Sequence, residues 1–178
     1  MARSTLAALA DHGVEAGDVK YVINTHLGDH SGENHLFKEA TFVIQRPEFE
    51  TVSAAAGTNP FAKPETFDFP GAKFELLDGE DAEVLSGVRV LFTPGHTVGH
   101  QSVLVDTGTE RQLFVGDAVY DTSIWADLDT MTEEHPAWDS QVAAGYDLWR
   151  ESANKLKAIG ADVVHFSHDE HTARSVTS

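Results

Sequence analysis

Histidine and aspartate recur directly after apolar runs in four short segments of this sequence. The candidate ligands are His26, Asp29 and His30 from residues 23–30 (INTHLGDH), followed by His96, Asp117 and His168 from the three later segments. Imidazole and carboxylate groups with this kind of spacing can hold a divalent metal ion. One such segment is a weak signal, but four in series predict a metal site.

The residue types that are absent narrow the chemistry of that site. The chain has no cysteine, so disulfides, thiolate nucleophiles and cysteine-ligated zinc are excluded. Any metal must be held by histidine and carboxylate groups. Zinc is the expected ion, at one or two per chain, and iron, manganese and cobalt suit the same ligand types. Such an ion lowers the pKa of bound water to about 7, so hydrolysis would need no serine or cysteine nucleophile.

Length and charge set further limits. With 178 residues, of which 41% are hydrophobic, the chain is expected to form one globular domain over residues 1–178. Its formal net charge of −17 repels phosphate backbones and anionic lipids, so we expect no nucleic-acid or membrane partner. The acidic excess leaves two interpretations open, a halophilic protein adapted to high salt or an ordinary acidic cytosolic protein.

The same sequence predicts a cytoplasmic location. The amino-terminal residues lack a long apolar core of the kind found in a secretory signal. No later window approaches the ~20 apolar residues that a membrane span requires.

Helical and strand patterns alternate along the chain, which indicates an α/β sandwich with its polar ligands along one edge of the sheets. Strands are expected over residues 19–25, 41–45, 73–77, 83–85, 88–92, 101–106, 111–115 and 162–166. Helices are expected from about residue 5 to a stop at Gly13, and over residues 32–37, 47–56 and 138–159. The segment 59–70, with three prolines, is expected to be an irregular loop.

These motifs resemble those of the metallo-beta-lactamase superfamily, and the resemblance runs through almost the whole chain. It rests on the histidine loop, the run PGHTVGH at residues 94–100, Gly116-Asp117, and Ser167-His168-Asp169. The resemblance implies an αββα sandwich and a metal-dependent hydrolase that acts on a small-molecule substrate. His100, in the second half of the PGHTVGH run, is expected to have a structural role.

The resemblance also implies roles for the candidate residues. One metal position would be formed by Asp29, His30 and His168, with Asp117 bridging to a second position formed by His96 and His26. Tyr120 follows Asp117 by three residues, a spacing similar to that of the acyl-homoserine lactonases, in which the tyrosine hydroxyl contacts the substrate carbonyl. Asp29 and Tyr120 are the expected catalytic residues.

Two features depart from the family pattern. The loop from His26 to His30 has five positions where the family has six, as if the second histidine were deleted. This predicts a mononuclear or weakened site and leaves open whether His26 reaches the metal. Met1 falls almost at the helix that precedes this loop, whereas family members usually begin with several strands. Either those strands are absent or the start is wrongly placed. An exposed sheet edge would promote association, so a homodimer is expected.

Several functions remain open at this stage. A hydrolase of an ester, lactone or thioester carbonyl is favoured, and Tyr120 favours lactones. The PGHTVGH run is shared with glyoxalase II-like thioesterases, but the basic residues that bind glutathione in that group have no clear counterpart here. A degenerate, weakly catalytic or non-catalytic metal-binding protein is the other main alternative. A nuclease is disfavoured by the acidic charge, and no residue selects a β-lactam substrate.

Overall fold

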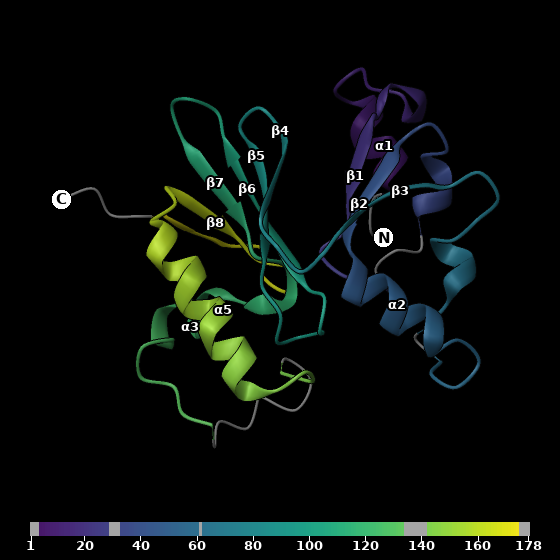
Figure 1. The fold of residues 1–178 in the computed structure, drawn as a ribbon. Helices are drawn as coiled ribbons and strands as arrows, with labels where there is room; N and C mark the ends of the chain where they lie inside the picture. The colour runs from purple at the N-terminus through teal and green to yellow at the C-terminus, as the bar shows by residue number, and fades with distance from the viewer. Residues whose placement is uncertain (1–3, 29–32, 61, 134–141, 175–178) are drawn as a thin grey trace.

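A computed structural model describes residues 4–28, 33–60, 62–133 and 142–174. In it, two β-sheets pack together and carry helices on their outer faces (Figure 1). The three-stranded sheet carries α1 (Thr5–Ala10) and α2 (Arg46–Ala54), and the six-stranded sheet carries α3 (Thr122–Asp127) and α5 (Tyr146–Ile159). This arrangement confirms the predicted α/β sandwich.

The three-stranded sheet is parallel and has the order β1-β2-β3. Its strands are β1 (Tyr21–Ile23), β2 (Thr41–Gln45) and β3 (Lys73–Leu77). In the central strand β2, four of the five residues are buried, as expected for a parallel strand covered on both faces. Helix α2 starts directly at the end of β2, with Pro47 in its first turn, where a missing backbone N–H costs nothing.

The six-stranded sheet follows chain order from β4 to β9. Its strands are β4 (Ala82–Leu85), β5 (Val88–Phe92), β6 (Gln101–Asp106), β7 (Arg111–Phe114), β8 (Val163–His165) and β9 (Thr172–Arg174). All neighbours are antiparallel except β7 and β8, which are parallel. A parallel pair needs a long crossover, and the segment containing α3 and α5 supplies it. Single 3-10 turns complete the described elements: η1 (Ala16–Asp18), η3 (Asn34–Leu36), η4 (Pro64–Thr66) and η5 (Gly116–Ala118).

The two sheets meet through both apolar and polar contacts. Val43, Leu77 and Val90 form one buried cluster that draws on both sheets. Beside it, the amide of Gln45 donates to the side-chain oxygen of Gln101 at 3.0 Å. The Gln101 amide in turn donates to the carbonyl of Val43 at 3.0 Å. Buried amides bonded in this way fix the register between the sheets, because a shift would leave them unpaired.

The strand predictions for residues 41–45, 73–77, 88–92 and 101–106 are confirmed at both ends. The expected helix over 138–159 is wrong at its start, because residues 142–145 form a turn and α5 begins at Tyr146. Gly145 has a φ of +121°, and the N–H of Ala144 donates to Gly95 rather than to a helical carbonyl. Residues 138–141 lie outside the described part of the chain. The short elements α3 and β9 were not predicted.

Among the described residues, no helix combines the length and the apolar character that crossing a membrane would require.

Candidate metal centre

His26 lies on the chain just after β1, at the edge where the two sheets meet. The carbonyl of the preceding residue, Thr25, accepts the backbone N–H of Gln101 at 2.8 Å. One residue earlier, the carbonyl of Asn24 accepts the side-chain amide of Gln101 at 2.8 Å. These bonds attach the end of β1 to the start of β6. The His26 ring is therefore buried, with 4% of the residue exposed.

His96 lies in the tight loop between β5 and β6, and two glycines let this loop fit between helices. Gly95 has a φ of +146°, and a Cβ there would lie 2.4 Å from the Cα of Trp149 in α5. Gly99 has an ordinary φ, but a Cβ there would lie 2.2 Å from the backbone nitrogen of Glu48 in α2. Because no side chain fits at either position, the loop packs directly on both helices and His96 is held between them.

Asp117 lies in η5, directly after β7, and its backbone is held by a buried histidine. The N–H of Asp117 donates to His100 Nε2 at 3.1 Å. His100 Nδ1 lies 3.1 Å from the carbonyl oxygen and 2.9 Å from the hydroxyl of Thr93. Since Nε2 accepts a bond, the single proton of a neutral ring lies on Nδ1. Burial lowers the pKa of His100 well below its usual value, in agreement with the structural role expected for it.

His168 and Tyr120 lie side by side at the open end of the site. The N–H of His168 donates to the carbonyl of Tyr120 at 3.1 Å, and the two ring centres are 4.3 Å apart. The Tyr120 hydroxyl lies 3.5 Å from His96 Nδ1. Asp169, the residue after His168, connects the His168 and Tyr120 segments. Its carboxylate accepts both the N–H and the hydroxyl of Thr122 at the start of α3.

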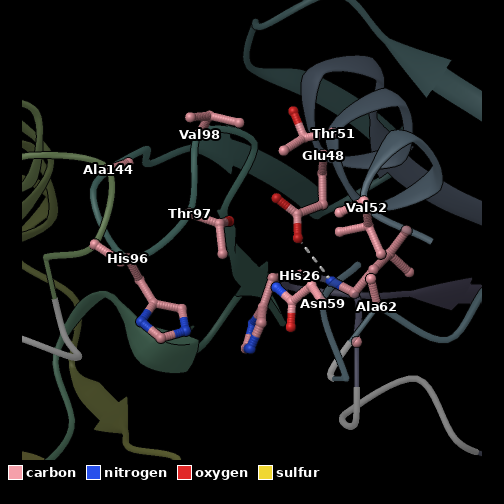
Figure 2. A pocket seen from close by; sticks show the side chains of 14 residues that line it. His26, Glu48, Thr51, Val52, Asn59, Ala62, His96, Thr97, Val98 and Ala144 are labelled. Carbon is pink, nitrogen blue, oxygen red and sulfur yellow. Dashed lines mark hydrogen bonds between the residues drawn. The ribbon is translucent and has the colours of Figure 1, made fainter. Parts of the chain in front are cut away.

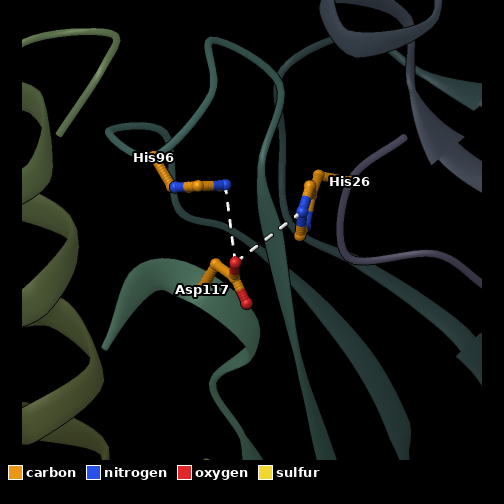
Figure 3. Close-up of side chains that lie close together, drawn as sticks. All are labelled: His26, His96 and Asp117. Atoms are coloured by element: carbon orange, nitrogen blue, oxygen red, sulfur yellow. Dashed lines mark ion pairs between the residues drawn. The ribbon is translucent and has the colours of Figure 1, made fainter. Parts of the chain in front are cut away.

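Three imidazoles converge on one carboxylate oxygen. Asp117 Oδ2 lies 3.4 Å from His168 Nε2, 3.5 Å from His96 Nε2 and 3.9 Å from His26 Nε2. Figure 3 shows the two more buried histidines pointing at this carboxylate. With metal bonds of about 2.0–2.2 Å, tetrahedral ligand atoms are separated by about 3.3–3.6 Å. The distances to His168 and His96 lie within this range, and the distance to His26 is about 0.3 Å longer. The donor types and this spacing make the group a candidate site for a divalent metal ion.

Electrostatics keep Asp117 in its anionic form. Burial alone would raise the pKa of Asp117, but the Ser167 hydroxyl and the three histidines outweigh it, so the pKa lies below its usual value. A carboxyl group must be ionised to serve as a metal ligand, so this property of Asp117 suits it for that task.

The structure brings together five of the residues singled out from the sequence, namely His26, His96, Asp117, Tyr120 and His168. His26, whose contact with the metal the shortened loop left open, lies in one group with His96 and Asp117, with ligand atoms within 4.8 Å of one another. The predicted ligands Asp29 and His30 lie outside the described residues. Sequence reasoning missed Glu48, a buried carboxyl in α2, because an acidic residue in a first helical turn is ordinarily a capping charge.

A cavity of about 630 Å³ opens beside the candidate metal centre. His26 and His96 line one end of it, as Figure 2 shows. Much of the remaining wall is apolar, formed by Val52, Ala55, Ala62, Val98, Ala143 and Ala144. This volume lies within the range of about 300–1,000 Å³ that is typical of small-molecule sites. The centre thus adjoins a space for a largely apolar ligand.

The sandwich fold, the histidine loop and the side chains gathered around Asp117 together indicate the family of this protein. The sequence model of the metallo-beta-lactamase superfamily matches residues 1–168, and the chain belongs to this superfamily. It is 40% identical over 165 residues to an N-acyl homoserine lactonase of Bacillus sp, covering 88% of this chain and 58% of that protein. It is 30% identical over 169 residues to an N-acyl homoserine lactonase of Bacillus thuringiensis, covering 92% and 61% of the two chains.

Solved structures of N-acyl homoserine lactone hydrolases are similar to this chain as well. One such structure is an N-acyl homoserine lactone hydrolase with N-hexanoyl-L-homoserine bound at its catalytic metal centre. It matches this chain with a TM-score of 0.71 and 28% identity, over 93% of this chain and 62% of that one. The present chain therefore spans about three fifths of the length of the relatives that it resembles.

Proposed function

We propose that this protein is a metal-dependent hydrolase that opens the lactone ring of N-acyl homoserine lactones. The observation that carries the proposal is the convergence of His26, His96 and His168 on Asp117, with the Tyr120 hydroxyl at the rim. Similarity in sequence and in structure supports it, since both the curated relatives and the structural neighbour are named for action on N-acyl homoserine lactones.

In this proposal each described residue has a chemical task. His26, His96 and Asp117 would hold one metal ion, with His168 beside Asp117. A bound ion would polarise the lactone carbonyl and acidify water. Asp117 stays anionic and so offers its oxygen atoms as ligands. The Tyr120 hydroxyl donates a hydrogen bond to the oxygen of the carbonyl as negative charge develops on it. The cavity beside His26 binds the acyl chain through Val52, Val98 and its other apolar walls.

Zinc is the proposed ion, on the basis of imidazole and carboxylate ligands. One ion fits the group formed by His26, His96 and Asp117. A second ion would need Asp29 and His30 together with His168, and Asp29 is retained as a proposed catalytic residue on the strength of the sequence motif alone.

Metal content is the first test of this proposal. We expect protein purified in high salt to contain one or two equivalents of zinc per chain by elemental analysis. A variant with one histidine inserted between Leu27 and Gly28 restores the family loop length and serves as the comparison. If metal and activity appear only in the insertion variant, the natural chain is a degenerate member of the superfamily.

Substrate class is tested by ring opening, which releases one proton per lactone. We expect N-acyl homoserine lactones to be hydrolysed, and Asp117→Asn to reduce metal affinity at least about a hundredfold and to abolish activity. Asp129→Asn, an exposed aspartate in the same connection, is the matched control and should behave as the unaltered protein. Turnover of acyl thioesters in place of lactones would transfer the proposal to the glyoxalase II-like alternative.

A homodimer and a cytoplasmic location also belong to this proposal. Strand β1 is the outer strand of the three-stranded sheet, with β2 as its one strand neighbour in the described part of the chain. An open edge of this kind favours pairing with a second copy. We expect a dimer mass in sizing chromatography with light scattering, and a shift towards monomer in Tyr21→Lys, because Tyr21 is 38% exposed on this strand. A single monomeric peak for the unaltered protein contradicts the dimer.

A further inference from the structure

Glu48 is a buried carboxyl group in the first turn of α2, and the residue has no exposed surface. Burying a carboxyl group is costly unless hydrogen bonds compensate for the lost water. The proposed reaction gives Glu48 no chemical task. The contacts that Glu48 makes with its neighbours therefore indicate the role of this buried carboxyl group.

The first contact is with the loop that carries His26. Glu48 Oε1 accepts the backbone N–H of Leu27 at 2.9 Å. Leu27 is the residue next to His26, so this bond sets the direction in which the chain leaves the histidine. Figure 2 shows the bond as a dashed line and places the Glu48 carboxyl between Thr97 and the chain beside His26.

The second contact is with the loop that carries His96. Thr97, the residue after His96, lies beside the Glu48 carboxyl group, as Figure 2 shows. Burial raises the pKa of the Glu48 carboxyl group, although the hydrogen bond from the Leu27 N–H opposes this rise. Gly99 also lies against the helix backbone, where a Cβ would come within 2.2 Å of the Glu48 nitrogen. Glu48 thus contacts both histidine loops, the first through its carboxyl group and the second through its backbone and Cβ.

We propose that Glu48 is a positioning residue that sets the distance between the His26 and His96 loops and so pre-forms the metal-binding group around Asp117. The two loops are separated by 70 positions in the sequence and come from different sheets. Glu48 joins them from a third element, α2. The inference rests on the proposed metal site, but not on the identity of the substrate.

Metal affinity tests this role without any assay of turnover. Glu48→Gln keeps an oxygen that can accept the Leu27 N–H but replaces the second acceptor with an amide donor. We expect this variant to bind zinc about tenfold to a hundredfold more weakly, as found for residues that orient metal ligands. The matched control is Glu50→Gln, an exposed residue on the same helix, whose zinc affinity should equal that of the unaltered protein.

A purely structural role would give a different pattern. It would lower the melting temperature of metal-free Glu48→Gln while leaving its zinc affinity and the absorption spectrum of its cobalt-substituted form unchanged. We expect the cobalt spectrum to change in Glu48→Gln and not in Glu50→Gln, because the geometry of the histidine ligands differs. Unchanged affinity and spectrum overturn the inference, and so does a failure of the unaltered protein to bind zinc or cobalt.

A second variant keeps the inference testable if Glu48→Gln does not fold. Thr97→Val leaves Glu48 in place and removes only the hydroxyl that faces it. We expect zinc affinity to fall about threefold, because the Glu48 carboxyl group loses its polar neighbour on the side of the His96 loop. An affinity equal to that of the unaltered protein, measured on folded Thr97→Val, would count against the contact to the His96 loop. A protein that binds zinc in this Glu48-dependent way but hydrolyses no lactone would contradict the proposed function alone.

Discussion

At the scale of single residues, Asp117 must keep a charged side chain while its backbone lies in a buried turn. Its side chain must stay charged, and three histidines and a hydroxyl favour the anion. Its backbone must stay fixed in a buried turn, and the Nε2 atom of His100 accepts its N–H. Gly116 makes this turn possible, because its φ is +57° and a Cβ would lie 2.9 Å from that same His100 nitrogen.

Tyr120 gives the residue-scale prediction. If its hydroxyl stabilises developing negative charge, Tyr120→Phe should lower the kcat of lactone hydrolysis about a hundredfold to a thousandfold. Zinc content should not change, because the proposed ligands stay in place. Steady-state kinetics together with elemental analysis measure both quantities. An unchanged kcat would leave Tyr120 as a packing residue against His168.

At the scale of elements, the site depends on helices that approach loops very closely. The His96 loop meets α2 at Gly99 and α5 at Gly95, and at both positions a Cβ would overlap the helix backbone. Helix α3 is connected to the same site through Asp169, which binds Thr122 at the first turn of α3. The ligand geometry is therefore a property of how the helices pack.

Gly99→Ala tests this close packing. The added Cβ would force α2 away from the His96 loop, and we expect a loss of about 3 kcal/mol in the free energy of unfolding. Urea unfolding followed by circular dichroism measures the change. Gly17→Ala is the control, since Gly17 has an ordinary φ and no atom within 4 Å of the added Cβ. Equal stabilities of the two variants would show that α2 can move without cost.

Asp121 gives a pH-dependent prediction at the start of α3. Its carboxylate accepts the N–H of Ile124 at 2.9 Å as the helix N-cap. Burial and the charge of Asp169 raise the pKa of Asp121, but hydrogen bonds from Ser123 and Ile124 outweigh them and lower it. A lowered folded-state pKa stabilises the protein above the unfolded-state pKa, and that stabilisation is lost as the pH falls through the folded-state value.

Asp121→Ala should therefore cost about 1 kcal/mol at pH 7. The difference from the unaltered protein should narrow as the pH falls below about 4, where the carboxyl group becomes protonated. Urea unfolding at a series of pH values measures this difference. A gap that stays constant down to low pH would mean that the charge of Asp121 contributes nothing to the cap.

At the scale of the whole molecule, charge is the dominant feature. The chain has 29 acidic residues against 12 basic ones. Ion pairs among the described residues include the contacts of Lys155 with Asp81 and of Arg46 with Asp78. The remaining acidic excess repels itself across the surface, and salt shortens the range of that repulsion from about 10 Å at 0.1 M to about 3 Å at 1 M.

The halophilic interpretation predicts that salt stabilises the fold. Raising potassium chloride from about 0.1 M to 2 M should raise the melting temperature by at least about 4 °C, which corresponds to roughly 1–2 kcal/mol for a chain of this size. Sodium sulfate is the comparison, because it strengthens burial of apolar surface in almost any protein. Stabilisation by sulfate but not by potassium chloride would favour the ordinary acidic interpretation.

Local sequence pattern was enough to predict most of the strands and the chemistry of the candidate ligands. Strands such as β2 and β6 could be predicted residue by residue, because period and side-chain branching are properties of neighbouring positions. The types of the ligands His96 and Asp117 were equally visible, since each follows the end of a strand.

Contacts between distant segments were decided only by the tertiary structure. Nothing near Glu48 in the sequence marks it as the partner of Leu27, because an acidic residue in a first helical turn is common at the surface. The start of α5 was missed because the backbone of Ala144 bonds to Gly95 in another part of the chain. The partner of Glu48 and the start of α5 depend on which loops and helices meet when the two sheets pack. Residues from the whole chain determine that packing.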